Sequence, residues 1–507
     1  MNEMSIKKAS IINAIAKYSS VIMSILFSAI LARILSPEDY GIVAIVTVFT
    51  AFFAVLCDMG IGAAIIQRKD LTSSDLGIIF GLTARIGIIL AISFCGLSIP
   101  ISILYGNSVY KPICCILSIS IFFNTLNMVP NALLMKDKKF VLVGVRMVIV
   151  NVLSYILTII MALLGAKYYA LVFQSVIFSI ANFIWNYHST KPRLIFKFDK
   201  KSIQKIKSYS VFQFLFSFVN YFERNLDNLL VGKIMGNYML AYYDKGYRLM
   251  SYPVSNLAGI ITPVLHPILS DYQDKQEKLL DKYIHISKLL SLIGTFVTPL
   301  CFCTGSEIIL IMYGNQWRNS ILLFKFLSLG VWPMLMMSTT GAIYQSIGNT
   351  KLLFKAGLIN GILTITFIII GVISGSVRNV AICVSIANYL NMIITFYILI
   401  NKGLKKSFWK FAKHFIGDLI AMVMIAGIGY VTFSKLAITS NLISFIIKGL
   451  VILAMYIIYL YISKQINIIN LLFKVISYRK MVSFCHLFSR KINRRFHYNT
   501  SRDKDKI

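Results

Sequence analysis

Positively charged side chains lie inside stretches of this chain that are otherwise apolar. They are Arg85, Arg146, Arg224, Lys245 and Arg248. A guanidinium group binds a phosphate or carboxylate through two parallel hydrogen bonds, which suits arginines to an anionic ligand. Arg85 and Arg146 have no acidic residue close by in sequence, and this favours a binding role over a structural ion pair. We therefore expect these residues to form a binding site for an anionic substrate.

Acidic residues occur in the same apolar stretches and have two interpretations. They are Asp58, Glu223, Asp227, Asp244 and Asp418. The middle three lie near Arg224, Lys245 and Arg248, so structural ion pairing is the alternative to ligand binding there. Asp58 and Asp418 are candidates for binding a coupling proton or cation, because a charge inside a membrane needs a partner or a wet cavity. Asp58 can equally cap a helix that restarts at Met59.

Signatures of enzymes and of metal sites are missing from the sequence. It contains no GxxxxGK[ST], HExxH or GxSxG motif, and its six histidines are scattered. Seven of the eight cysteines fall in apolar stretches without the paired spacing of metal ligands, so they are interpreted as small apolar residues. We expect no enzymatic activity, no metal and no cofactor. Transport would then draw on a proton or sodium gradient, or on the gradient of the substrate itself.

Membrane-spanning helices must position these charged residues. Hydrophobic residues make up 57% of the chain and charged residues 14%, against about 25% charged in soluble proteins. The mean hydropathy is +0.75. Several uncharged runs exceed the roughly 20 residues that a helix needs to cross a bilayer core, among them 112–135 and 356–377. The pattern predicts an all-α polytopic membrane protein with about 14 transmembrane helices.

Lysine and arginine alternate between the gaps that separate the apolar stretches. They gather in the gaps after even-numbered stretches and are sparse in the others. The positive-inside rule then places the basic gaps and both termini in the cytoplasm. The net charge of +32 therefore indicates topology and not nucleic-acid binding. The basic tail 464–507 has the pattern of a helix on anionic phospholipid, and a disordered tail is the equal alternative.

A polar stripe occurs twice, about 200 residues apart. Near the middle of the chain it has spacings of four and three residues, which place its members on one face of a helix: Gln213, Ser217, Asn220, Arg224 and Asp227. Near the start the same spacing gives Asn13, Lys17, Ser20 and Ser24. With the loop charges, this repeat predicts two parallel six-helix lobes around a central cavity. Their ranges are 1–188 and 209–402, joined by a basic linker at 189–208, with two extra helices in 403–463.

Two segments carry a resemblance to a known family. LARILSPEDYGIVAIVTVF, within 31–82, and NLDNLLVGKIMGNYMLAYYDKGYRLMSYP, within 225–273, resemble the polysaccharide-exporter, Wzx-type branch of the multidrug/oligosaccharidyl-lipid/polysaccharide (MOP) flippase superfamily. The resemblance covers most of residues 5–460. It implies flippases of the bacterial inner membrane that carry undecaprenyl-diphosphate-linked oligosaccharides of O-antigen, capsule or exopolysaccharide. It also implies alternating access, with a polysaccharide polymerase and a chain-length regulator as partners.

On this hypothesis the diphosphate is held by arginines, with Arg85 and Arg146 near the inward opening and Arg224 and Arg248 further out. The alternatives are a cation-coupled multidrug antiporter of the same superfamily and a flippase of another isoprenoid-linked precursor. An antiporter cavity should be net acidic, whereas the buried basic residues here slightly outnumber the acidic ones. A membrane glycan polymerase usually needs a large external loop, and the longest external gap is only about 305–319. Neither motif indicates which sugar is carried.

Overall fold

The computed structural model of the protein is built from α-helices. It describes residues 3–58, 60–68, 70–196, 199–270, 276–347, 349–434 and 438–465, and no strand occurs in these ranges. In parts of α1 and α10 the backbone alone is described. The tail predicted at 464–507 lies, from residue 466 onward, outside the described residues.

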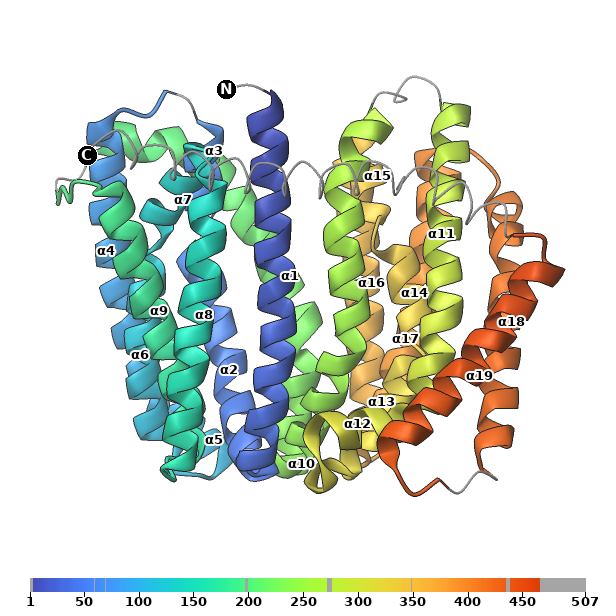
Figure 1. Ribbon diagram of the computed structural model, residues 1–507. Helices are drawn as coiled ribbons and strands as arrows, with labels where there is room; N and C mark the ends of the chain where they lie inside the picture. The colour runs from blue at the N-terminus through green and yellow to red at the C-terminus, as the bar shows by residue number, and fades with distance from the viewer. Residues whose placement is uncertain are drawn as a thin grey trace, which may run out of the picture.

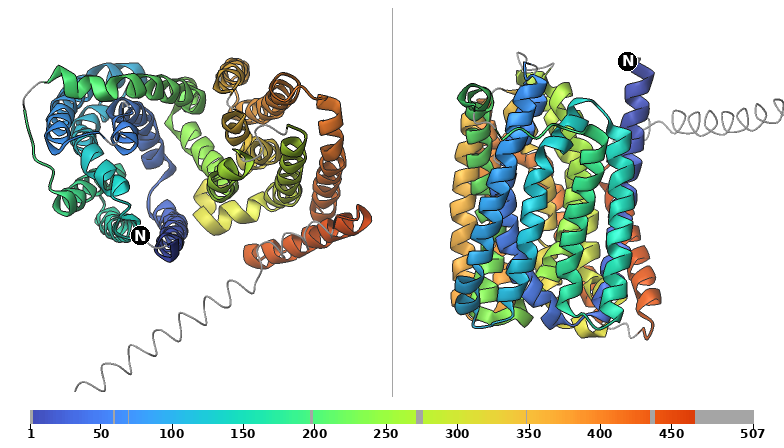
Figure 2. Two further views of the ribbon diagram at one scale, coloured as in Figure 1. Left: turned by 90° about the horizontal axis from the view of Figure 1, so that it is seen from above. Right: turned by 90° about the vertical axis from the view of Figure 1, so that its left-hand side faces the viewer.

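The first part of the chain forms one bundle, drawn in blue to green in Figures 1 and 2. Its long helices are α1 (Glu3–Ile34), α2 (Pro37–Asp58), α4 (Ser73–Gly96), α6 (Tyr110–Leu126), α8 (Phe140–Leu163) and α9 (Tyr168–Thr190). Three short helices lie between them: α3 (Ile61–Gln67), α5 (Ser98–Tyr105) and α7 (Met128–Lys136). We call α1 to α9 the first bundle.

Local sequence explains where these helices start and break. Thr72 and Asp75 form a capping box at the start of α4, in which each side chain accepts a hydrogen bond from the other residue's backbone N–H. The breaks at Leu97 and Asn127 are each followed three residues later by a proline, Pro100 or Pro130. Proline lacks the N–H that an uninterrupted helix would need, but it is tolerated in the first turn of a new helix.

The second bundle begins with a 71-residue helical element, α10 (Lys200–Ser270), that turns back on itself at Gly236. Gly236 has φ 85°, a conformation that glycine adopts without steric cost. Its two arms pack against each other, since Tyr243 on the second arm donates a 2.7 Å hydrogen bond to Asp227 on the first. The remaining elements of this bundle are α11 (Gln276–Cys303), α12 (Gly305–Tyr313), η1 (Asn315–Trp317), α13 (Asn319–Ser328), α14 (Val331–Met337), α15 (Thr340–Ser346), α16 (Thr350–Ile373), α17 (Val377–Tyr397) and η2 (Ile398–Gly403).

Two further helices, α18 (Phe408–Ser434) and α19 (Asn441–Ile462), lie at the side of the second bundle, in orange-red in Figure 1. The segment between the bundles is shorter than the predicted linker 189–208, because α9 ends at Thr190 and α10 begins at Lys200. Residues 191–196 have no helical structure and run along α4.

The predicted class, an all-α multi-pass membrane protein, is confirmed. Among the described residues, ten helices are long and apolar enough to cross a membrane, and eleven if the bent pair Asn319–Ser328 and Val331–Ser346 counts as one span. The described apolar part of α1, Tyr18–Ile34, is shorter, and the arms of α10 are not in this count. The number of about 14 therefore stays a prediction.

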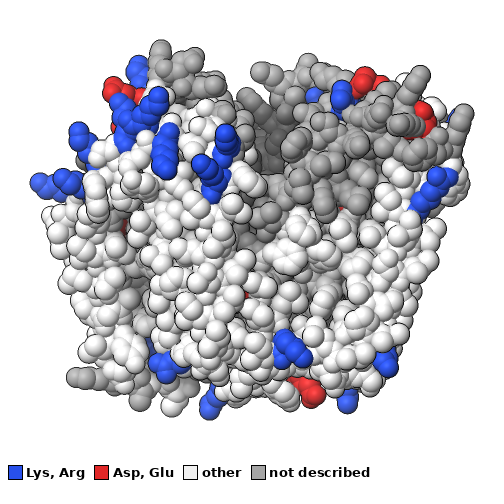
Figure 3. Space-filling model, turned by 180° about the vertical axis from the view of Figure 1, so that it is seen from behind, with Lys and Arg blue, Asp and Glu red and all other residues white. Residues whose placement is uncertain are grey.

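The outer surface matches a bilayer. Figure 3 shows lysine and arginine along the upper and lower rims of the molecule, with a broad band nearly free of charge between them. Large apolar side chains on the outside are exposed, such as Ile92 on α4, Leu163 on α8 and Ile458 on α19. Such a surface suits lipid and not water. The N-terminus, α3 and α7 lie at the upper end, and α5 and α12 at the lower end (Figure 1).

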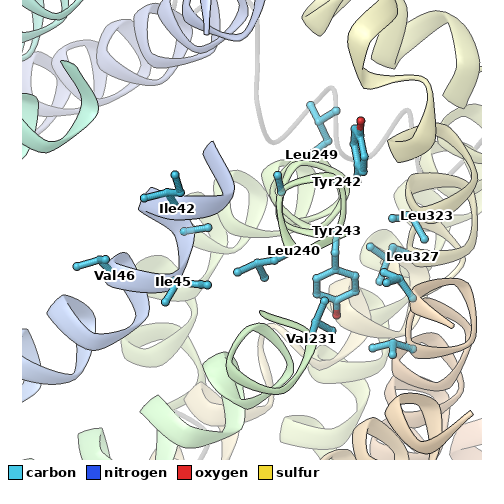
Figure 4. Packing of buried hydrophobic residues seen from close by; sticks show 14 of the residues in the cluster. Ile42, Ile45, Val46, Val231, Leu240, Tyr242, Tyr243, Leu249, Leu323 and Leu327 are labelled. Atoms are coloured by element: carbon cyan, nitrogen blue, oxygen red, sulfur yellow. The ribbon is translucent and has the colours of Figure 1, made fainter. Parts of the chain in front are cut away.

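The two bundles meet where α2 packs on both arms of α10. Ile45 of α2 faces Leu240 of α10, and α13 covers the opposite side of α10 (Figure 4). At the lower end the approach is closer still, because a Cβ atom placed on Gly41 would lie 2.2 Å from the backbone oxygen of Asn237. Glycine at position 41 is what allows α2 to touch the turn of α10.

Candidate functional site

Arg248 lies on the second arm of α10, and its side chain is 55% exposed. Its Nε donates a 2.7 Å hydrogen bond to Asp244 one turn earlier. No other hydrogen bond joins the Arg248 guanidinium to a described residue, so within the described structure its two terminal nitrogens are available to a ligand. The predicted ion pair between Asp244 and Arg248 is thus present, and it orients the guanidinium without occupying it.

Hydroxyl and aromatic side chains of both bundles lie near this arginine. The Tyr155 hydroxyl of α8 donates a 3.3 Å hydrogen bond to Ser24 of α1, and Tyr252 of α10 lies close to Ser24. The Phe27 ring stacks on Tyr155 with 4.7 Å between ring centroids. Tyr252 in turn lies within electrostatic reach of Arg248. We call Ser24, Tyr155, Arg248 and Tyr252 the central cluster.

The central cluster lies near the middle of the membrane. Arg248 is 12 residues past the turn at Gly236, and Ser24 is 10 residues before the end of α1. At 1.5 Å per residue these positions are about 18 and about 15 Å from the lower ends of their helices. A bilayer core is about 30 Å thick. The cluster therefore joins the two bundles at a depth where an exposed charge is costly unless it faces a polar space.

Lys245 has a different environment from its neighbour Arg248. Its ammonium group lies over the rings of Tyr40, Tyr313 and Trp317, at 3.6, 4.7 and 5.2 Å from their centroids. Only 3% of the residue is exposed. Cation–π contacts of this kind are stabilising in a desolvated site. This enclosure favours a structural role for Lys245 over the predicted contact with substrate.

The aromatic rings around Lys245 belong to a packed contact between the bundles at their lower end. Trp317 donates a 2.8 Å hydrogen bond from Nε1 to the backbone oxygen of Ala32, at the end of α1. Arg33 donates a 2.7 Å hydrogen bond to the backbone oxygen of Ile311. The Tyr40 ring packs edge-on against Trp317, with 5.4 Å between centroids. We call Ala32, Arg33, Tyr40, Lys245 and Trp317 the closure cluster.

Asp227 is buried and is not paired with a cation among the described residues. Its carboxylate accepts hydrogen bonds from the Tyr243 hydroxyl, at 2.7 Å, and from the Asn228 backbone N–H, at 2.8 Å. The expectation was an ion pair, and the structure instead gives Asp227 the Tyr243 hydroxyl as its side-chain partner. The side chains of Glu223 and Arg224 lie outside the described residues.

Arg146 is buried inside the first bundle, with 8% exposed. It donates hydrogen bonds to the side-chain oxygens of Asn131, at 3.2 Å, and of Asn186. Asn186 donates in turn to Asn127, at the break between α6 and α7, at 2.7 Å. Arg146 thus ties α8 to α7 and α9. It lies nine residues before Tyr155 on α8, about 14 Å away along the helix, so it is nearer the upper end than the central cluster.

Arg85 contacts the segment that joins the bundles. Its guanidinium donates a hydrogen bond to the backbone oxygen of Phe196 and lies 5.7 Å from the centroid of the Phe196 ring. The neighbouring Ile195 N–H donates to the Gly77 oxygen at 3.1 Å. A Cβ atom on Gly81 would lie 2.1 Å from the Ile195 oxygen, so only glycine fits there. Arg85 has no acidic residue nearby in sequence, but in the fold the backbone oxygen of Phe196 is its partner.

Asp58 is the last residue of α2, and its side chain is exposed. The alternative, that it caps a helix restarting at Met59, stays a prediction, because Met59 lies outside the described residues. The next described helix, α3, begins at Ile61 with Gly60 as its N-cap residue at φ 67°. A coupling role for Asp58 also stays a prediction.

Asp418 is fully buried in an ion pair. Its carboxylate accepts hydrogen bonds from Lys288, at 2.7 Å, from Ser291, at 2.6 Å, and from Tyr459. These residues join α18 and α19 to α11. A second buried pair, Lys448 with Glu307, ties α19 to α12 at 2.5 Å. Both pairs connect residues more than 120 positions apart, which is why the sequence pattern did not indicate them.

Asp418→Ala is expected to destabilise the protein by about 3–5 kcal/mol, because it leaves the Lys288 ammonium buried without a counter-charge. Thermal unfolding of the purified protein in detergent would measure this loss. The double variant Asp418→Leu/Lys288→Met removes both charges and should recover most of the lost stability. Equal melting of the wild type and Asp418→Ala would show that the buried pair does not hold α18 in place.

Comparison with solved structures identifies the fold. This chain shares it with transporters of the MOP superfamily. It is similar to the lipid II flippase MurJ in an inward closed conformation, with a TM-score of 0.72 and 20% identity over 90% of this chain and 100% of that one. It is also similar to an inward-facing multidrug resistance MATE family transporter, with a TM-score of 0.61 and 16% identity over 75% of this chain and 94% of that one.

Comparison of sequences then shows the family. Residues 30–322 match the model of a family described as polysaccharide biosynthesis protein, and the chain belongs to this family. Curated relatives include the lipopolysaccharide biosynthesis protein WzxC of Escherichia coli K12, 23% identical over 78% of this chain and 81% of that protein. The teichuronic acid biosynthesis protein TuaB of Bacillus subtilis 168 is 23% identical over 76% of this chain and 81% of that protein. The predicted resemblance is confirmed.

Aromatic residues of both clusters were missed by the sequence reasoning. Tyr155 and Tyr252 lie in apolar stretches, where an aromatic side chain is usually part of the core. Ser24 had a usable signal, because it belongs to the repeated polar stripe of α1. For Trp317 the signal was weaker: it lies in the short gap 305–319, where tryptophan has little reason to occur unless it packs against another element.

Proposed function

We propose that this protein is a flippase that moves undecaprenyl-diphosphate-linked oligosaccharide units of O-antigen, capsule or exopolysaccharide across the bacterial inner membrane, without an enzymatic step. The observation that carries the proposal is the half-exposed guanidinium of Arg248, held at mid-membrane depth between the bundles. Family membership, relatives named for polysaccharide biosynthesis, and a fold similar to a lipid II flippase support it.

The chemistry of Arg248 fits a diphosphate. Its Nε is fixed by Asp244, and its terminal nitrogens can donate two parallel hydrogen bonds to phosphate oxygens. Ser24, Tyr155 and Tyr252 present hydroxyl groups nearby, which suit the first sugar of the glycan. The polyprenyl chain would stay in lipid between the bundles. In this proposal Arg146 and Arg85 have a structural role and do not bind substrate. Arg146 holds α7 in place, and Arg85 holds the segment after α9.

The closure cluster supports transport by alternating access. It holds the bundles together at their lower end, so in this conformation substrate would reach the central cluster from the upper end. Rocking of one bundle against the other would break this cluster and close the upper end. A ligand that binds more tightly to the conformation closed at the upper end shifts the population toward that conformation.

The orientation and the partners are part of the same proposal. The upper end carries the gaps rich in lysine and arginine, which favours the cytoplasm for that end and for both termini. Its basic rim suits anionic phospholipid. A polysaccharide polymerase and a chain-length regulator would act on the exported units, and a proton or sodium gradient would drive the cycle.

Deletion of the gene tests this function in the cell. The deletion strain should lose its surface polysaccharide and accumulate the lipid-linked repeat unit on the inner leaflet, and a plasmid copy should reverse both effects. Loss of surface polysaccharide with no accumulated intermediate would instead indicate a defect in polymerisation or in precursor synthesis, and would contradict the proposal.

A further inference from the structure

Two cysteine sulfurs lie in contact within the first bundle. The Sγ atoms of Cys95 and Cys115 are 2.9 Å apart. Cys95 is the next-to-last residue of α4, directly before the break at Leu97, and Cys115 lies in the second turn of α6. The interpretation of the cysteines as small apolar residues gave no reason for two of them to meet.

Close packing of α4 against α6 brings the two thiols together. Two turns before Cys95, Gly87 lies so near α6 that a Cβ atom there would be 3.2 Å from Thr125 and 3.3 Å from Phe122. The helices run in opposite directions, so the same contact face reaches Cys115. A disulfide has an S–S bond of about 2.0 Å, and the sulfurs need to approach by only about 0.9 Å to form one.

The pair lies at the surface of the bundle, near its lower end. Cys115 is exposed and Cys95 is partly exposed, whereas the adjacent Cys114 is buried. Cys115 lies five residues past Tyr110, about 8 Å from the lower end of α6. In the proposed orientation this is the outer end of the bundle, next to a compartment in which disulfides persist.

We propose that Cys95 and Cys115 are a modification site that forms a disulfide between α4 and α6. One thiolate attacks an external disulfide oxidant, RSSR, and releases RSH; the second thiol then displaces a second RSH and closes the bond. Two cysteine thiols are oxidised and one external disulfide is reduced to two thiols. Both helices belong to the first bundle, so the bond leaves the motion between bundles free. It holds the end of α4 on α6 where α4 breaks into α5. The proposal goes beyond the transport function and uses only its orientation.

Thiol counting on the full-length protein tests the proposal. Protein purified from cells without reductant, or after incubation with excess glutathione disulfide, is denatured and alkylated with a maleimide reagent before and after reduction. The wild type should show two thiols that react only after reduction, and peptide mapping should place them at positions 95 and 115. In Cys95→Ser and Cys115→Ser this protected pair should be lost, whereas Cys114→Ser and Cys383→Ser should keep it.

Two further readouts separate the bond from the transport function. The oxidised wild type should unfold at a higher temperature than its reduced form, and this difference should vanish in Cys115→Ser, while surface polysaccharide stays at the wild-type level in that variant. Complete alkylation without reduction, even after glutathione disulfide, would overturn the proposal. A protected pair that survives in Cys95→Ser would overturn it as well, because other cysteines would then form the bond.

Discussion

Replacement of Arg248 by alanine is expected to abolish glycan export while the amount of protein in the membrane stays unchanged. The guanidinium is the exposed cation of the central cluster and already has its orientation fixed by Asp244. Each hydrogen bond between charged groups contributes about 1.5–3 kcal/mol, so loss of two weakens diphosphate binding by roughly 10²- to 10⁴-fold. Surface polysaccharide in a complemented deletion strain would measure the effect.

Two variants separate binding from structure. Arg248→Gln can still donate a hydrogen bond to Asp244, but it has no positive charge and cannot donate two parallel hydrogen bonds to a diphosphate. Glycan export should therefore be lost, as in Arg248→Ala. Arg248→Lys keeps the charge and loses the paired geometry, so it should retain partial export. The matched control is Arg318→Ala, which removes an exposed arginine at the lower end. Normal polysaccharide in Arg248→Ala and Arg248→Gln would exclude Arg248 as the binding group.

Replacement of Trp317 by alanine is expected to open the closed end of the molecule. Its indole is fully buried between the bundles, donates to Ala32, and packs on Tyr40. Loss of a buried tryptophan costs about 3–5 kcal/mol, and the lost hydrogen bond about 1 kcal/mol more. Much of this cost falls on the closed arrangement, because Ala32 and Tyr40 belong to the other bundle. A conformation open at the lower end should therefore become more populated.

Labelling of a single cysteine measures this opening. In a chain whose native cysteines are replaced, Ser28→Cys lies on α1 near Tyr313, above the closure cluster. A membrane-impermeant maleimide added from the outer side should label it several-fold faster in Trp317→Ala. Trp332→Ala is the matched control, since Trp332 is equally buried but stacks on Tyr389 inside the second bundle. Equal labelling in the two tryptophan variants would show that Trp317 does not hold the bundles together.

Much of the fold was predictable because a membrane restricts the sequence of each spanning segment to a long apolar run. Long uncharged runs must be helices where no water satisfies the backbone, so the all-α multi-pass class followed from 112–135 and similar stretches. The turn at Gly236 and the breaks at Leu97 and Asn127 were harder to place. In lipid a broken helix and a continuous one have the same composition, and only the neighbouring prolines give a local signal.

The candidate site was predictable in residue type but not in partner. Arg248 and Asp244 are one turn apart on one helix, and that spacing alone indicated their contact. The partners of Arg85, Arg146 and Asp418 come from segments 15 to 130 residues away, and they include a backbone oxygen and two amides. Sequence proximity to acids cannot detect such partners. Lys245 lies only three residues from Arg248, yet its ammonium group faces aromatic rings that α2, α12 and η1 contribute, and spacing along one helix cannot indicate them.

The most direct test of the central claim is a flipping assay with purified protein in proteoliposomes. A fluorescent undecaprenyl-diphosphate-linked oligosaccharide is placed in both leaflets, and an impermeant reagent added outside modifies the exposed glycan. Wild-type protein under an imposed ion gradient should make nearly all of the lipid accessible, whereas vesicles with Arg248→Ala should stop at the outer-leaflet fraction. If wild-type vesicles also stop there, and instead take up an organic cation against its gradient, the protein is an antiporter and the flippase account is wrong.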